Sequence, residues 1–185
     1  MIKYITLLIS LVGLNAVLAD DPSEKGVPTS PLTVYSGGIG GGAAFSLNDE
    51  LSRESEQFFK LSFINSMRYK ENLNLFMDVD WFIPGNNYGV DFGIDYLLSS
   101  SEFSPFLGMG VGAHYFDKEG ADFGENVGAS ATVHLGFLLD LSDALQIRVR
   151  VPYHFTANDA RDQAIGLDIG FLFSDRFRHI KKLNY

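Results

Sequence analysis

The 185-residue chain contains no cysteine, so no disulfide can hold its fold together. Without disulfides, the fold must be held by packing and backbone hydrogen bonds. The absence of a cysteine after residue 19 also argues against a lipid anchor. Basic residues are few, with 14 Lys and Arg against 23 Asp and Glu. That balance disfavours nucleic acid as a partner.

Long apolar runs are missing as well. The apolar stretch that follows Lys3 ends near Leu14 and is shorter than the roughly 20 residues that a membrane-spanning helix needs. A positive charge, a short apolar core and small residues up to Ala19 are typical of a secretory signal peptide. We expect residues 1–19 to be that peptide, cleaved after Ala19; the alternative is a buried N-terminal helix or strand.

Two further segments have the composition of loops. Residues 20–34 contain Pro22, Pro28 and Pro31 among small polar residues, which predicts a flexible lead-in. Residues 174–185 are expected to form a basic periplasmic tail, either solvated or bound to an anionic partner. Its bases are Arg176, Arg178, Lys181 and Lys182.

Residues 35–173, enough for one domain, alternate between apolar and polar. Phe59, Leu61 and Phe63, for example, are separated by Lys60 and Ser62. Side chains on a strand point to opposite faces in turn, so a period of two predicts strands with one apolar and one polar face. We expect strands over residues 35–47, 59–69, 73–83, 88–98, 107–115, 127–137, 145–155 and 165–173.

The breaks between these strands alternate in length. Tight breaks fall at residues 70–72, 99–102 and 140–143, and mostly longer, more charged ones at 48–56, 84–87, 117–125 and 157–163. An even number of antiparallel strands with short turns at one rim is the layout of an outer-membrane barrel. The predicted fold is therefore all-β, an eight-stranded antiparallel up-and-down transmembrane β-barrel.

A soluble lipophile-binding barrel would also alternate, with its apolar set inside. Three observations favour lipid outside: the polar set is dominated by small residues, the apolar set has Asn65 as its one clearly polar exception, and aromatic residues gather near strand ends. Such rings favour membrane interfaces. They are Tyr69, Trp81, Tyr88, Tyr96, Tyr115, Tyr153, Phe155 and Phe173.

The segment Ser104-Pro-Phe-Leu-Gly-Met-Gly-Val-Gly-Ala-His-Tyr115 resembles the Pro-Phe-x-Gly-x-Gly-x-Gly strand of the OmpA-like, opacity-type and porin-family barrels of Gram-negative bacteria. The resemblance covers residues 35–173 and implies a cell outer-membrane location and insertion by the barrel-assembly machinery. Two departures stand out. We expect no peptidoglycan-binding domain after residue 173, so the resemblance does not imply the wall-tethering role of two-domain relatives, and the last expected strand ends twelve residues before Tyr185.

By parity, one set of charged residues points into the barrel. Ions in a narrow interior must be paired, because an unpaired buried charge is costly. We expect a plug of ion pairs, with a narrow ion path as the alternative, since wide channels need about 16 strands. The predicted network is Lys60, Arg68, Asp78, Asp80, Asp91, Asp95, Arg148, Arg150 and Asp168, with His114, His134 and His154 as interior histidines.

One weak catalytic candidate emerges from the last two strands. A hairpin centred about residue 161 would place His154 opposite Asp168, with Thr156 nearby. The His-x-Thr pattern is similar to the His-x-Ser of outer-membrane lipid A deacylase barrels, but threonine replaces serine and parity points the group inward. A structural His–Asp pair is the preferred interpretation. The three interior histidines lack ligand-like spacing, so we expect no metal or other cofactor.

The favoured function is that of a non-enzymatic, monomeric outer-membrane protein with a plugged interior and an envelope-structural or surface-contact role. Expected partners are outer-membrane lipid and lipopolysaccharide. The acidic loop residues are either simply solvated or bind divalent cations that bridge lipopolysaccharide phosphates. Those acids are Asp49, Glu50, Glu54, Glu56, Asp117, Glu119, Asp122 and Asp159. The alternatives are a lipid hydrolase that uses His154 and the soluble lipophile-binding barrel.

Overall fold

The structure, a computed structural model, describes residues 34–174 except 71, 100 and 143. The predicted signal peptide, all but the last residue of the lead-in and residues 175–185 of the basic tail lie outside the described residues. Among the described residues, no helix is long and apolar enough to cross a membrane.

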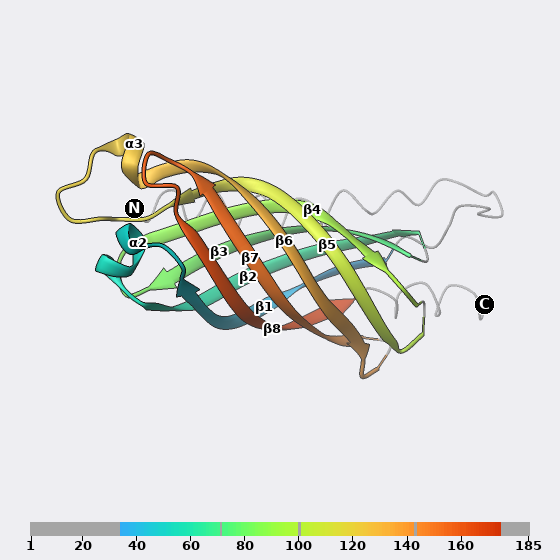
Figure 1. Cartoon of the computed structure of the whole chain (residues 1–185). Helices are drawn as coiled ribbons and strands as arrows, with labels where there is room; N and C mark the ends of the chain where they lie inside the picture. The colour runs from blue at the N-terminus through green and yellow to red at the C-terminus, as the bar shows by residue number, and fades with distance from the viewer. Residues whose placement is uncertain (1–33, 71, 100, 143, 175–185) are drawn as a thin grey trace, which may run out of the picture. The chain divides into compact units, whose positions relative to one another are not determined.

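Eight antiparallel strands pair in chain order and β8 returns to pair with β1, which closes the barrel (Figure 1). This confirms the predicted all-β, eight-stranded antiparallel barrel. A six-residue helix, α2 (Asp49–Glu54), joins β1 to β2, and α3 (Phe123–Asn126) precedes β6. The strands are β1 (Val34–Ser46), β2 (Gln57–Lys70), β3 (Leu73–Ile83), β4 (Asn87–Leu97), β5 (Phe103–Tyr115), β6 (Val127–Asp140), β7 (Leu145–Ala157) and β8 (Gln163–Ser174).

The two ends of the barrel differ as the spacing predicted. The connections that carry α2 and α3, together with residues 84–86 and 158–162, lie at one end, here called the loop rim. The tight connections β2–β3, β4–β5 and β6–β7 lie at the other end, the turn rim, where β1 begins and β8 ends. Every strand therefore runs from one rim to the other.

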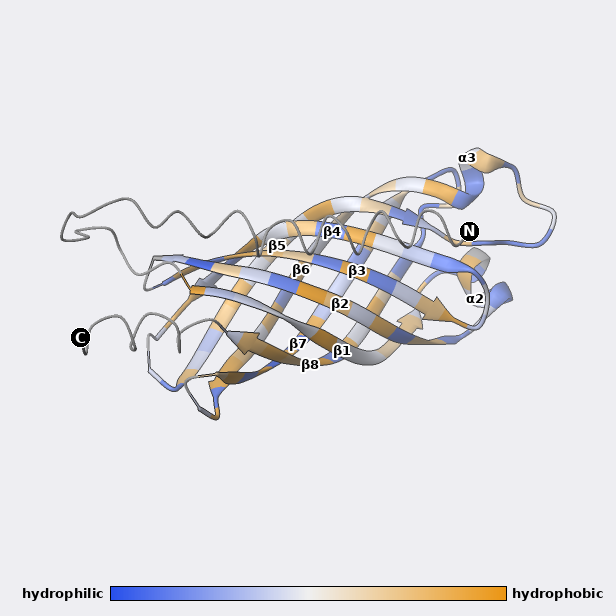
Figure 2. Cartoon of the chain, turned by 180° about the vertical axis from the view of Figure 1, so that it is seen from behind, coloured by the Kyte–Doolittle hydropathy of each residue, from blue (hydrophilic) through white to orange (hydrophobic). Residues whose placement is uncertain are grey.

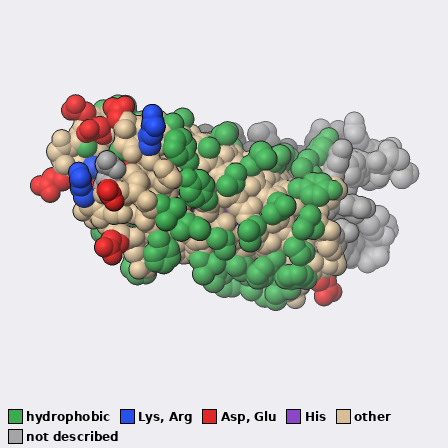
Figure 3. Space-filling model, viewed as in Figure 1, with side chains coloured by type: hydrophobic (Ala, Val, Ile, Leu, Met, Phe, Trp, Pro, Cys, Tyr) green, Lys and Arg blue, Asp and Glu red, His purple; other side chains and the backbone are tan. Residues whose placement is uncertain are grey.

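The apolar set of each strand points outward. On β5, Leu107, Met109 and Val111 are 56%, 60% and 66% exposed, whereas Phe106 and His114 are buried. Hydrophobic and hydrophilic residues alternate along the strands in Figure 2, and hydrophobic side chains cover the strand surface in Figure 3. The outward direction of the apolar set contradicts the soluble lipophile-binding alternative, which needs that set inside.

The β7–β8 register differs from the sequence-based prediction. Arg150, not His154, lies opposite Asp168, and His154 lies opposite Ala164. The connection is closed by Asn158, whose side chain hydrogen-bonds Asp162, so that the Thr156 amide donates to the Asp162 carbonyl. The hairpin thus turns nearer β7 than residue 161, and the predicted pairing of His154 with Asp168 is wrong.

The inward set is not purely polar, which the sequence analysis overlooked. One apolar cluster closes the loop-rim end: Ala44, Leu51, Phe58, Phe82, Phe116 and Ala164. A second lies toward the turn rim: Ile64, Leu97, Phe106, Leu138 and Leu172. Leu51 comes from α2 and is 1% exposed, so this short helix inserts a side chain into the mouth of the barrel. The predicted inward charged residues other than Arg68 lie between the two clusters.

Removal of a ring from the loop-rim cluster should destabilise the barrel. Phe82 is 2% exposed inside, and Phe82→Ala should cost about 3–5 kcal/mol through lost contacts and a cavity. Phe92→Ala, which removes the same ring from the outer surface, should cost clearly less. Urea unfolding of both variants in detergent tests this; equal losses would contradict a packed interior cluster.

Candidate functional site

A continuous chain of ion pairs crosses the interior. It starts at Asp80 on β3, whose carboxylate lies 3.2 Å from Lys60 Nζ. Lys60 on β2 also lies 2.6 Å from Asp168 on β8. Asp168 in turn accepts a hydrogen bond of 2.8 Å from Arg150 Nε on β7. Three successive contacts therefore tie together strands that do not all adjoin.

The chain continues through a second carboxylate of β3. Arg150 lies 2.6 Å from Asp78, and Arg148 contacts the same carboxylate at 3.3 Å. Arg148 reaches Asp95 on β4 at 3.2 Å, and His134 Nε2 on β6 lies 2.7 Å from the other oxygen of Asp95. All five side chains are at most 3% exposed. Buried ions on this scale are tolerated only when each has partners of opposite charge.

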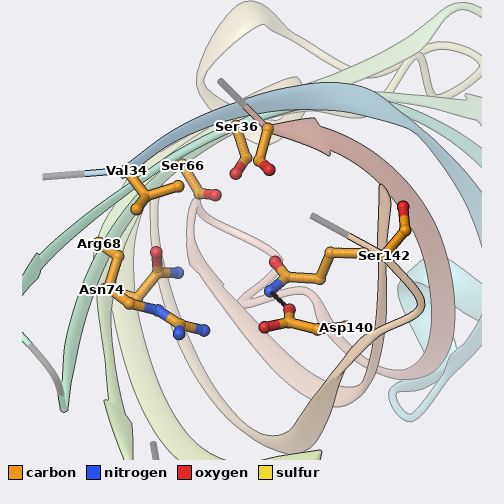
Figure 4. A pocket seen from close by; sticks show the side chains of 9 residues that line it. Val34, Ser36, Ser66, Arg68, Asn74, Asp140 and Ser142 are labelled. Carbon is orange, nitrogen blue, oxygen red and sulfur yellow. Dashed lines mark hydrogen bonds between the residues drawn. The ribbon is translucent and has the colours of Figure 1, made fainter. Parts of the chain in front are cut away.

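Arg68, the remaining base of the predicted network, lies apart from this chain. It lines a small polar cavity near the turn rim with Asn74 and Asp140 (Figure 4), where Gln146 donates a hydrogen bond to Asp140. A second cavity lies beside Arg148, Arg150 and Asp168. Each offers about 10 Å³, room for about one water. Small separate cavities of this kind favour an interior plugged by ion pairs over a narrow path for ions through the barrel.

The predicted hydrolytic residues are not assembled. Asp168 is held by Lys60 and Arg150, and His154 Nδ1 lies 3.0 Å from the Thr132 hydroxyl instead. Thr156 is buried in the interior at 1% exposure. Neither a His154–Asp168 pair nor a hydroxyl open to a lipid substrate is present among these residues.

His154 instead belongs to a group that the sequence analysis did not find. Ligand atoms of Asp91, His114 and His154 all lie within 4.8 Å of one another, and all three residues are buried. His114 Nε2 lies 3.1 Å and His154 Nδ1 3.7 Å from Asp91 Oδ2. The residues come from β4, β5 and β7, so their spacing in the sequence does not predict that they lie close together. Strand register, which brings His114 beside Gly89 and His154 beside Thr132, was the usable signal.

Glycines of β5 explain how these groups reach each other. Gly108 pairs with Asp95 on one side and His134 on the other, so the Asp95–His134 contact passes over it. Likewise, Ser130 reaches across Gly112 to Asp91, with 2.8 Å between its hydroxyl and the carboxylate. A Cβ on Gly108 would lie 2.1 Å from His134 Nε2 and 2.5 Å from Asp95 Oδ1. Two of the three glycines in the Pro-Phe-x-Gly-x-Gly-x-Gly segment, Gly108 and Gly112, therefore act as spacers under interior polar pairs.

Loss of Lys60 should leave the Asp80 carboxylate without a cationic partner among the described residues. In Lys60→Met, Asp168 keeps Arg150, but within the described part of the chain the hydrogen-bond partner left to Asp80 is the Ser62 hydroxyl, which carries no charge. We expect a cost of about 3–5 kcal/mol in unfolding free energy. Lys60→Met combined with Asp80→Asn should recover much of that loss, because no uncompensated ion remains. Denaturant unfolding of the three variants measures the coupling; a double variant no better than Lys60→Met would contradict it.

A methyl group on Gly108 should disrupt the Asp95–His134 pair. Gly108→Ala is expected to cost about 1–3 kcal/mol, as overpacking commonly does. Gly37→Ala is the matched control, since its Cβ meets only Asn65 Oδ1, at 3.7 Å. Comparison of their unfolding midpoints tests the spacer role, and equal midpoints would count against it.

Comparison with known proteins shows likeness in fold. No family model and no curated protein matches the sequence. Neisserial surface protein A matches with a TM-score of 0.57 at 15% identity, over 76% of this chain and 96% of that one. The N-terminal β-barrel domain of Pseudomonas aeruginosa OprF matches at 0.52 and 11% identity, over 78% and 100%. OprG, an outer membrane protein of the same species, matches at 0.50 and 14%, over 78% and 96%. The chain thus has the fold of small eight-stranded outer-membrane barrels.

Proposed function

We propose that the protein is an integral, non-enzymatic barrel of the cell outer membrane with a sealed interior, and that it acts in envelope structure or surface contact through its loop rim. The observation that carries the proposal is the inversion of the barrel: exposed apolar side chains outside, and ion pairs with apolar clusters inside. Water outside such a barrel would face a continuous apolar surface. Hydrocarbon is the solvent that this surface suits.

Backbone closure supports the same location. Hydrocarbon offers no hydrogen-bond partner to a strand edge, so only a closed sheet can span it. Here β1 pairs with both β2 and β8. Aromatic side chains also adjoin near the loop rim, where Trp81, Tyr88 and Tyr115 are paired neighbours on β3, β4 and β5. Such rings are typical of the membrane interface.

The loop rim carries most of the visible charge and is acidic (Figure 3). Its connections are tied to one another: Lys118 Nζ lies 2.6 Å from Asp162, and Asn158 donates to the Glu125 carbonyl. A preformed rim is suited to contact, and an acidic one would need divalent cations to approach lipopolysaccharide phosphates. The exposed acids are Asp49, Glu54, Glu56, Asp117, Glu119, Asp122 and Asp159.

The lipid hydrolase is the less supported function, because Asp168 serves the ion-pair chain rather than His154. The monomeric state and passage through the barrel-assembly machinery remain part of the proposal. The fold buries its own strand edges, so no second copy is needed to complete the sheet.

Fractionation and conductance test this proposal together. The native chain should appear in the detergent-extracted outer membrane as a band whose gel mobility changes on heating. Reconstituted in a planar bilayer, it should give no steady conductance, because the interior is filled. Recovery as a soluble periplasmic protein would refute the membrane location, and stable single-channel steps would refute the sealed interior.

A further inference from the structure

We propose that Asp91, His114 and His154 form a binding site for a divalent transition-metal ion of the Zn²⁺ class inside the barrel. The site lies below the loop-rim apolar cluster, where Phe82 and Phe116 pack on the His114 ring with centroids 5.8 and 6.0 Å away. It uses none of the residues of the ion-pair chain, and its existence does not depend on the role proposed for the loop rim.

The spacing of the donor atoms suits zinc. Bonds of about 2.0–2.1 Å in a tetrahedral site place neighbouring ligand atoms roughly 3.4 Å apart. Asp91 Oδ2 lies 3.1 Å from His114 Nε2 and 3.7 Å from His154 Nδ1, on either side of that value. The two imidazole nitrogens lie within 4.8 Å and would approach each other by a rotation of one ring. Two imidazoles and a carboxylate are ligands that Zn²⁺ commonly takes in proteins.

The negative charge of Asp91 has no Lys or Arg partner among the described residues, which favours a bound cation. Lys60, Arg148 and Arg150 make their ion pairs with Asp78, Asp80, Asp95 and Asp168, as described above. Among the described residues, the side-chain partners of Asp91 are His114, His154 and Ser130, with no Lys or Arg. A buried carboxylate is costly without a positive partner, and histidines bind a metal in their neutral form. A divalent ion at this point would supply the missing positive charge.

The surroundings of the site hold its ligands in place. Ser130 donates a hydrogen bond of 2.8 Å to Asp91 Oδ1, which leaves Oδ2 for the metal. Outer partners of this kind orient metal ligands and raise affinity. The Thr132 hydroxyl lies 3.0 Å from His154 Nδ1 and limits the rotation of that ring. A water would complete a four-coordinate site. Gly89 provides the room for His114, since a Cβ there would lie 2.7 Å from Cδ2 of the ring.

One feature limits the affinity. His114 Nδ1 is buried and has no hydrogen-bond partner among the described residues. Metal-bound histidines usually donate their second N–H to an oxygen. Binding through Nε2 leaves a proton on this unpartnered nitrogen, so the site should bind zinc less tightly than sites with a complete second shell.

The test uses tag-free full chain, refolded in detergent with and without Zn²⁺ and then dialysed against metal-free buffer. Refolding matters because the apolar cluster covers the site. Metal analysis should find one Zn²⁺ per barrel, with a raised thermal midpoint, and no such effect from Mg²⁺ or Ca²⁺. Co²⁺ in its place should give the visible absorption of a tetrahedral site.

Three variants separate this site from incidental binding. His114→Gln and His154→Asn should each weaken zinc binding at least 100-fold, and Ser130→Ala about tenfold. The controls are His134→Gln, which alters an equally buried His–Asp pair, and His179→Gln in the tail; both should retain the metal. If the native chain refolded with Zn²⁺ holds no zinc after dialysis, the proposal is wrong. It is also wrong if His134→Gln or His179→Gln loses the zinc while His114→Gln and His154→Asn retain it. Far-ultraviolet circular dichroism identifies any variant that fails to fold, and Ser130→Ala then carries the test.

Discussion

Closure of an eight-stranded sheet on itself is the constraint on which the rest of this structure depends. The β1–β8 contact brings backbones very close: a Cβ on Gly38 would lie 1.9 Å from the Phe171 carbonyl oxygen, and one on Gly42 would lie 2.2 Å from that of Leu167. Side chains at positions 38 and 42 of β1 would therefore prevent closure. The glycine-rich segment at residues 37–42 is what allows the last strand to meet the first.

A closed barrel of this size has an interior that its own side chains must fill. The chain fills it with three layers, an apolar cluster near each rim and the ion-pair chain between them. Aromatic rings join the layers, since Arg148 lies 5.8 Å from the centroid of Phe106 in the turn-rim cluster and Lys60 lies 6.0 Å from that of Phe82 in the loop-rim cluster. The packing makes the interior a core rather than a passage. The proposed contact surface is therefore the loop rim, and the one interior ligand we propose is a metal ion among His114, His154 and Asp91.

Much of the fold was readable because a period of two constrains every strand. The alternation gave the strand number, the closed sheet and the inward position of residues such as Lys60, Asp80 and Arg150. The alternation did not predict which inward residues are apolar or which inward residues contact each other across strands. Phe58, Phe82 and Phe106 share the inward parity of the charges, so their apolar character was passed over. The proximity of residues on different strands depends on register, which each turn sets. Because the Asn158–Asp162 contact closes the β7–β8 connection, Asp168 lies opposite Arg150 and not opposite His154. The predicted hydrolytic group is therefore absent, and His154 lies near Asp91 and His114 instead.

The central claim is that the apolar face meets lipid while the polar face is sealed, and the absence of native cysteine makes it directly measurable. Single cysteines at Met109, exposed on β5, and Thr132, buried on β6, would be placed in the barrel reconstituted in vesicles. A fluorophore attached to Met109→Cys before reconstitution should be quenched by brominated acyl chains. Unlabelled protein should leave both cysteines unreactive toward a water-soluble maleimide until it unfolds. Rapid reaction of Met109→Cys in the folded, reconstituted barrel would contradict the account, because that face would then lie in water.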